Sequence, residues 1–326
     1  MRGETQVVVG KNLALAAGVA AAAFVALVVM GAGCDKKQPS SASPGTDSVA
    51  APALGSENAA QTYLSVYDAL GKPLLDAVAN GDAADAMLKQ HAADIEKIVE
   101  ASRSPSCDFG VDYSAGLETM LPHLGKLRPL ARVLKADATR LLAAGDTDAA
   151  AKRVAALLRM AMQIAKPGRT MIELLVANAI ALLATDIVIT NESLARAAWK
   201  TDIQQAIAAT QRDLVQNSGQ VVQRDVEIAP GSLRQGKGLD LTPLGGRNWN
   251  AASQAEREAA AKKLDAIAAE YVRAWDQPDA VSRLKALGER AQKEGVDDLV
   301  SAPHKARESV NKLRDELAKA GAVLSK

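Results

Sequence analysis

The sequence predicts an all-α fold of stacked helical hairpins, or helix bundle, with eight or nine helices. Alanine makes up about one residue in five of the 326-residue chain, and aromatic residues only 3%. Alanine has the highest intrinsic helix propensity, while strands favour β-branched and aromatic residues. Along most of the chain, apolar residues recur at intervals of three or four, which places them on one face of a helix.

Composition also excludes several classes of protein. The chain has 39 Lys and Arg against 38 Asp and Glu, a formal net charge of +1. Nucleic-acid-binding proteins usually carry a basic surplus or patch, so we expect no nucleic-acid partner. Two cysteines are too few for a disulfide framework or a cysteine-rich metal module. We expect no cofactor and no metal centre of that kind.

The first element is a signal or anchor at residues 1–33. Arg2 and Lys11 precede an uncharged apolar run, Leu13–Gly33, which ends at Cys34. A positive start, an apolar stretch and small residues at its end are typical of a secretory signal. The tetrapeptide Gly31–Cys34 resembles the lipobox of bacterial lipoproteins, in which the cysteine is acylated and becomes the new N-terminus. This resemblance implies lipid attachment at Cys34.

An uncleaved membrane-spanning helix is the alternative, because the apolar run has 21 residues and about 20 suffice to cross a bilayer. Residues 34–56 are rich in Ser, Pro, Ala and Gly, which predicts a disordered tether. With the positive N-terminus inside, either anchor places the following domain outside the cytoplasm. We therefore expect a membrane-anchored protein of the bacterial cell envelope.

The main helical domain is predicted at 57–217. Its first helix shares one apolar face among Tyr63, Val66, Leu70 and Leu74, and a second helix covers about 83–101. Two further apolar stripes, at 117–141 and 150–164, meet at the turn Gly145–Asp146. Gly145 can adopt the left-handed geometry that ends a helix, and Asp146 can cap the next. The sequence thus predicts helical hairpins.

Residues 171–189 (MIELLVANAIALLATDIVI) are apolar nearly all round. In a soluble domain this pattern predicts a central helix that other helices cover. A membrane span is the competing interpretation, but Glu173, Asn178 and Asp186 would make it costly. A further helix is expected from Asn191 to about Val215.

The glycine-rich stretch 218–249 shows little periodicity and predicts a loop or a linker between two helical parts. It contains GxxxxGK at 231–237, but glycine at 238 replaces the P-loop Ser or Thr that binds magnesium. We therefore expect a plain loop. Helices resume in a C-terminal subdomain at 250–326, which we expect either to pack on the main domain or to form a smaller bundle. In its first helix, Leu264, Ile267, Tyr271 and Trp275 share one face. Its last helix carries a seam of Val310, Leu313, Leu317, Ala320 and Leu324.

Candidate chemistry centres on Cys107, Asp112 and His123, which lie around the loop before the third predicted helix. A thiolate, a carboxylate and an imidazole could bind zinc, and a Cys–His pair could act as an activated nucleophile. The competing interpretation is a buried thiol, a capping aspartate and a structural histidine. No residue is assigned a catalytic role.

The same region carries a second resemblance. Cys107-Asp108-Phe109, then Leu121-Pro122-His123-Leu124 and Leu127–Arg132, are similar to a CD[FW]…LPHL…LR.LAR pattern in a group of all-helical proteins of bacterial envelopes. The resemblance covers about residues 100–185. It implies a helical fold, with no activity to carry over.

These observations predict a non-enzymatic binding or scaffold protein of the bacterial envelope. The helical hairpins and the lack of recognisable catalytic motifs support this hypothesis. Its partners would be the membrane, through an N-terminal lipid or helix, and another envelope protein. The alternative is an extracytoplasmic enzyme or metal-binding protein centred on Cys107, Asp112 and His123.

Overall fold

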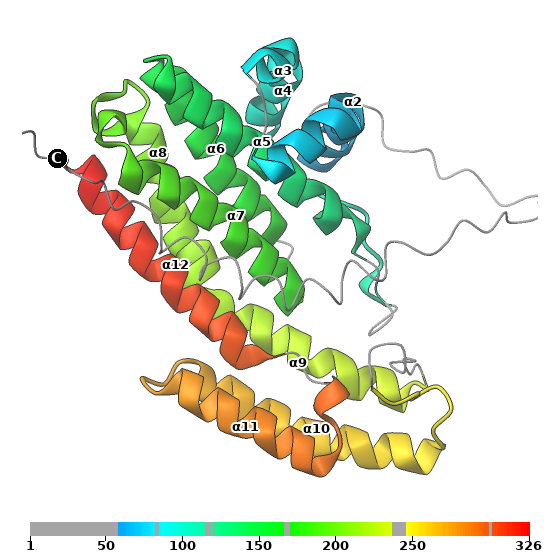
Figure 1. Cartoon of the computed structure of the whole chain (residues 1–326). Coiled ribbons are helices and arrows are strands. Elements are labelled where there is room, and N and C mark those ends of the chain that lie inside the picture. Colours follow the sequence, from blue (N-terminus) through cyan, green and yellow to red (C-terminus); the bar gives the residue numbers. More distant parts are fainter. Residues whose placement is uncertain are drawn as a thin grey trace, which may run out of the picture. The chain divides into compact units, whose positions relative to one another are not determined.

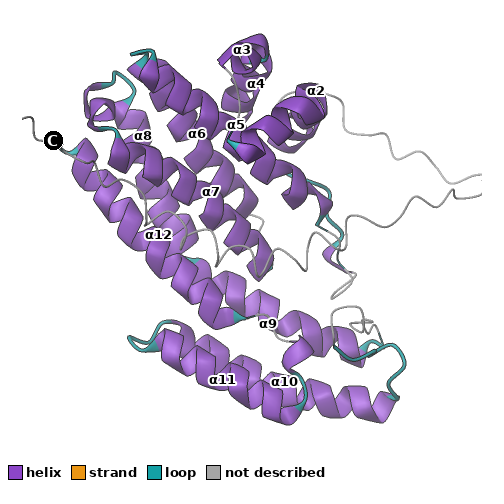
Figure 2. Ribbon diagram, viewed as in Figure 1, coloured by secondary structure: helices purple, strands orange, loops and turns teal. Residues whose placement is uncertain are grey.

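The structure, a computed structural model, describes residues 58–81, 85–114, 119, 121–165, 170–236, 246–299 and 302–326. Within these ranges every regular element is a helix and none is a strand (Figure 2). The predicted all-α fold is therefore confirmed. The expected signal or anchor at 1–33, Cys34 and the tether at 34–56 lie outside the described residues.

The α-helices are the main elements, and three short helical turns lie between them. In chain order they are α2 (Ala59–Asn80), α3 (Asp85–Gln90), α4 (Ala92–Ala101), α5 (Pro122–Ala143), α6 (Thr147–Ala165), α7 (Met171–Thr190), η2 (Glu192–Arg196), α8 (Lys200–Thr210), the π-helical turn η3 (Gln211–Gln216), α9 (Ser218–Arg234), α10 (Gln254–Trp275), α11 (Ala280–Glu294), η5 (Asp297–Leu299) and α12 (Pro303–Leu324).

The described ranges thus hold more helices than the eight or nine expected. One reason is that the helix expected at 83–101 divides at His91 into α3 and α4, because the backbone of His91 (φ −98°, ψ 14°) leaves the helical region. A second reason is α9, which lies in the stretch expected to be a loop. Helix α2 also bends sharply at Gly71, whose φ of +70° suits glycine.

Helices α5 and α6 form the hairpin that the sequence predicts. Gly145 ends α5 with φ +80°, and a carboxylate oxygen of Asp146 accepts the backbone N–H of Ala149 at 3.0 Å. Pro122 occupies the first turn of α5, where the missing N–H costs nothing. Pro129 lies within α5 without ending it. The hairpin packs against α2 and α7.

Helix α7 is central, as its all-round apolar sequence predicts. It packs against α5, α6 and α12 (Figure 1). Among the described helices it alone is long and apolar enough to cross a membrane by composition, yet 56% of that window is buried inside the protein. This burial is what a core helix requires.

The stretch 218–249 differs from its prediction. Residues 218–234 form α9, although Pro230 and Gly231 lie within it. Val221, Val222, Ala229 and Leu233 are buried, and α9 packs along α10 (Figure 1). Tertiary packing here outweighs weak helix propensity. Residues 237–245 lie outside the described ranges.

Of the two arrangements expected for the C-terminal helices, the structure has packing on the main helical domain. Helix α10 packs on α9 and α11, whereas α12 packs on α11 and returns to α7. The described residues on both sides of 237–245 accordingly belong to one compact unit. The predicted seam of α12 is buried along its whole length. A boundary at 218–249 is thus not observed, because α12 joins the last helices to the central one.

Two sets of hydrogen bonds between buried side chains connect the N-terminal helices. The carboxylate of Asp137 accepts hydrogen bonds from Arg140 (2.7 Å) and Arg153 (2.9 Å), and Arg153 also donates to Glu96 (2.6 Å). These contacts join α4, α5 and α6. Nearby, Tyr63 of α2 donates to the Gln163 side-chain oxygen of α6 at 2.6 Å.

Candidate functional site

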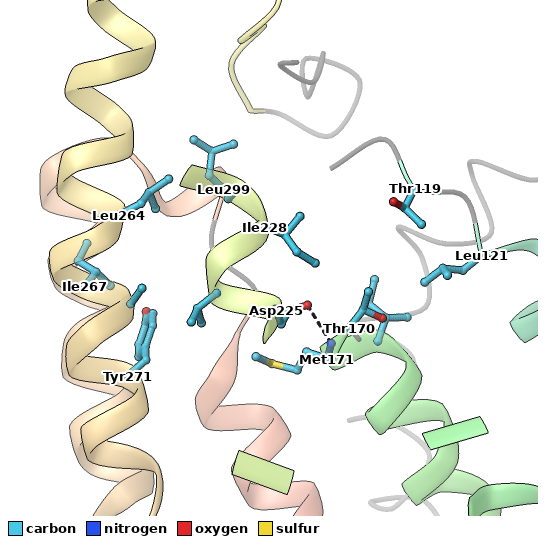
Figure 3. Close-up of a pocket in the computed structure, with 14 residues that line it drawn as sticks. Thr119, Leu121, Thr170, Met171, Asp225, Ile228, Leu264, Ile267, Tyr271 and Leu299 are labelled. Carbon is cyan, nitrogen blue, oxygen red and sulfur yellow. Dashed lines mark hydrogen bonds between the residues drawn. The ribbon is translucent and has the colours of Figure 1, made fainter. Parts of the chain in front are cut away.

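A cavity of about 150 Å³ lies between the N-terminal end of α7, helix α9 and helix α10 (Figure 3). Most of its lining is apolar, and the polar lining residues are Thr119, Thr170, Asp225 and Tyr271. The apolar lining residues are Leu121, Met171, Ile172, Val226, Ile228, Ala229, Leu264, Ile267, Ala268 and Leu299. A concave, mainly apolar site with a few polar groups is the usual form of a small-molecule site.

Helical periodicity explains how α9 and α10 supply this lining. On α10, Leu264, Ile267, Ala268 and Tyr271 recur at intervals of three, one and three, so they lie on one face. On α9 the lining residues are Asp225, Val226, Ile228 and Ala229. The two faces oppose each other where the helices pack, and Figure 3 shows Tyr271 on the side of α10 that faces α9.

The N-terminus of α7 forms a polar edge of the cavity. Thr170 and Glu173 make a reciprocal capping box, in which each side chain accepts the other residue's backbone N–H. The Asp225 carboxylate of α9 accepts the backbone N–H of Met171 at 2.9 Å (Figure 3). Three backbone N–H groups at this helix end, those of Thr170, Met171 and Glu173, are therefore already bound by protein side chains.

Tyr271 is the exception among these polar groups. The residue is 1% exposed, and within the described part of the chain its hydroxyl has no hydrogen-bond partner. Burial raises the pKa of Tyr271 to about 12, so the group is a neutral hydroxyl at physiological pH. A buried hydroxyl without a partner costs about 1–3 kcal/mol, and Tyr271 lies at the wall of a cavity.

One apolar lining residue of the cavity is also exposed to solvent. It is Ile172, the one large hydrophobic side chain, among those described, that the fold leaves exposed, at 40%. Asp225 is the only charged residue among the described lining residues. The described lining thus provides one negative charge, already engaged with Met171, and no positive charge.

The contacts of Cys107, Asp112 and His123 are those of structural residues: a protonated thiol, a carboxylate that caps a turn and a stacked ring. Cys107 is largely buried, and burial followed by the charge of Asp108 raises the pKa of its thiol to about 12. A thiol of that pKa is protonated at neutral pH, whereas nucleophiles and metal ligands are thiolates. A carboxylate oxygen of Asp112 accepts the backbone N–H of Ser114 at 2.9 Å, as in a capping turn.

His123 is buried and stacks on Phe109, with ring centroids 4.3 Å apart. Burial lowers the pKa of His123, although the nearby Glu173 raises it. Across the described residues, no three His, Cys, Asp or Glu side chains are grouped to hold a metal ion. The described residues therefore lend no support to a metal site at Cys107, Asp112 and His123, whose side chains make separate contacts.

The region around these residues instead supports the cavity. Tyr113 donates a hydrogen bond to Glu173 at 2.5 Å, which holds the loop against the capped end of α7. Thr119 and Leu121, further along the same segment, line the cavity. The segment that holds Cys107, Asp112 and His123 thus supplies part of the cavity wall. Sequence reasoning placed Tyr271 on an inward face, but no sequence signal reveals its unpaired hydroxyl.

Comparisons with family models, with curated proteins and with solved structures found no match to this chain. The assignment of a function therefore depends on the chemistry of the site itself. That chemistry comprises a mainly apolar cavity, an exposed apolar lining residue, Ile172, and a neutral hydroxyl, Tyr271, without a partner among the described residues.

Proposed function

We propose that the protein is a membrane-anchored, extracytoplasmic binding protein of the bacterial envelope, and that its helical domain holds a small ligand between α7, α9 and α10. The unpaired hydroxyl of Tyr271 carries this proposal. A protein without a ligand loses stability by burying such a group in an apolar wall. A ligand that supplies the missing hydrogen bond restores that loss. No catalytic role is assigned to any residue.

Native mass spectrometry of the full chain, extracted from membranes in mild detergent, tests binding. Ala268 lines the cavity, whereas its neighbour Ala269 is exposed on the same helix. We expect a bound small molecule in the wild type and in Ala269→Trp, and its loss in Ala268→Trp, where the indole fills the cavity. Equal retention by both variants, or no bound molecule in the wild type, would overturn the proposal.

The anchor is proposed from the sequence, through the apolar run Leu13–Gly33 and the lipobox-like Cys34. Labelling of cells with an alkyne fatty acid should mark the wild type and leave Cys34→Ala unmarked. Label that persists in Cys34→Ala would contradict acylation there. Proteinase K added to spheroplasts should digest the helical domain, and protection of that domain would contradict its location outside the cytoplasm.

A further inference from the structure

We infer that the cavity selects a neutral, ring-sized apolar group that bears one hydrogen-bonding oxygen, which it presents to Tyr271. This inference rests on the proposed binding function and names the chemical class of the ligand. Three properties of the described lining lead to it: the cavity volume, the sign of the lining charge and the unpaired hydroxyl.

The volume sets the size of the group. An apolar cavity of about 150 Å³ is known to accept a benzene-sized molecule, and this cavity has about that volume. Because Ile172 lines the cavity and is also partly exposed to solvent, a longer apolar molecule can place one end inside and cover Ile172 with the remainder. Burial of that side chain adds to affinity without any polar contact.

The charge of the lining sets the charge of the group. Asp225 is negative, and the described lining contains no Lys, Arg or His. A charged group of either sign placed against the apolar lining would lose its hydration without gaining an opposite charge among the described lining residues other than Asp225, so its binding is disfavoured. Asp225 already accepts the Met171 amide, and the apolar walls beside it favour a neutral ligand over an ammonium group.

The hydroxyl of Tyr271 sets the polar contact. It is neutral and can donate one hydrogen bond or accept others. A ligand oxygen, in a hydroxyl or a carbonyl, can pair with it inside the cavity. A purely apolar ligand would leave the hydroxyl unpaired and forgo this contribution.

Titrations of the full chain in lipid nanodiscs with three water-soluble probes of equal ring size test the inference. The probes are benzyl alcohol, benzoate and benzylamine, and the readout is the ¹³C-methyl resonances of Ile172 and Met171, which line the cavity. We expect saturable shifts with benzyl alcohol and Kd values at least about tenfold higher for the other two probes. Equal or tighter binding of benzoate or benzylamine would overturn the inferred class.

Tyr271→Phe isolates the hydrogen bond because it removes only the oxygen. We expect the Kd of benzyl alcohol to rise by about five- to tenfold, the usual contribution of one hydrogen bond. Tyr67→Phe, on the half-buried face of α2 outside the cavity, is the matched control and should leave the Kd unchanged. An unchanged Kd in Tyr271→Phe would overturn the role of the hydroxyl.

The two proposals fail in different ways. If the ligand class is wrong but the cavity binds ligands, a charged probe still gives saturable methyl shifts that Ala268→Trp abolishes. If the binding function is wrong, no probe gives saturable shifts at Ile172 and Met171. In that case Ala268→Trp and Ala269→Trp also behave alike in the mass measurement.

Discussion

Two buried tyrosines in different parts of the helical domain differ in whether the side-chain hydroxyl has a hydrogen-bond partner. Tyr63 of α2 donates to Gln163 of α6 at 2.6 Å. The amide of Gln163 in turn donates to backbone carbonyls at the end of α4, including that of Ser104 at 2.9 Å. Tyr271 of α10 has no partner among the described residues. Burial raises the pKa of both tyrosines.

This difference separates a structural region from a candidate binding region. The hydrogen bonds from Tyr63 to Gln163 and from Gln163 to Ala101 join α2, α6 and α4, which fixes the relative positions of these helices. Around Tyr271 the polar capacity is left open beside a cavity and an exposed apolar residue. The hydroxyl of Tyr63 is hydrogen-bonded within the protein, as in a structural region. The hydroxyl of Tyr271 has no partner among the described residues, and we propose that a ligand supplies it.

The largest expected effect lies in the structural region. Asp137→Ala leaves Arg153 and Arg140 without the buried carboxylate that both contact. We expect the free energy of unfolding to fall by up to about 3–5 kcal/mol, because Arg140 loses its buried partner and Arg153 keeps only Glu96. Urea denaturation followed by circular dichroism measures the change. The control is Asp68→Ala, whose exposed pair with Lys126 should contribute less than about 1 kcal/mol. Equal effects of the two substitutions would contradict this view of the region.

The same chemical change at the two tyrosines sharpens the comparison. Tyr63→Phe should lower the free energy of unfolding by about 1–3 kcal/mol, because the Gln163 oxygen loses its buried partner. Tyr271→Phe should leave it unchanged or raise it slightly in the ligand-free protein, because no protein hydrogen bond among those described is lost. Both values come from the same denaturation experiment. A large loss of stability in Tyr271→Phe would indicate that its hydroxyl has a partner in the fold.

The cap of α7 connects stability with the site. Thr170→Ala removes one half of the buried capping box and should cost about 1 kcal/mol of unfolding free energy. It should also weaken the binding of benzyl alcohol, because Thr170 lines the cavity. Ser253→Ala removes the equivalent half of the box on α10, which lies outside the lining. That control should lower stability while probe binding is preserved.

The smallest expected effect is a pH dependence. Burial lowers the pKa of His123 below its usual value of 6.5. As the pH falls through 6.5, the unfolded chain binds a proton at this position before the folded protein does, so stability falls. His123→Phe keeps the stacking on Phe109 and should remove this part of the pH dependence. Denaturation at several pH values between 5 and 8 measures the difference, and identical profiles would contradict it.

Much of the fold could be predicted from local pattern. The all-round apolar sequence of α7 and the seam of α12 predict burial, and both are buried. The turn at Gly145 follows from the need for a left-handed residue. Helix α9 could not be predicted, because its stability comes from packing against α10 rather than from the propensities of Pro230 and Gly231.

The candidate site was less accessible from the sequence. Tyr271 belongs to a predicted inward face, but whether its hydroxyl finds a partner depends on which side chains of α7 and α9 reach it. Cys107 was a candidate nucleophile or metal ligand because the sequence shows that the residue is a cysteine but does not show that its thiol is buried. The raised pKa of its thiol follows first from burial, which the sequence does not show, and then from the charge of the neighbouring Asp108.

The packing of α12 on α7 has a consequence for synthesis of the protein. Helix α7 ends at Thr190, and the helix that covers one of its apolar faces begins at Pro303, about 110 residues later. At about 5–20 residues per second, that face waits roughly 5 to 25 seconds for its partner to be made. The newly made chain therefore carries its most apolar helix incompletely covered through the last third of translation. Any product that stops before Pro303 would keep that face open to aggregation.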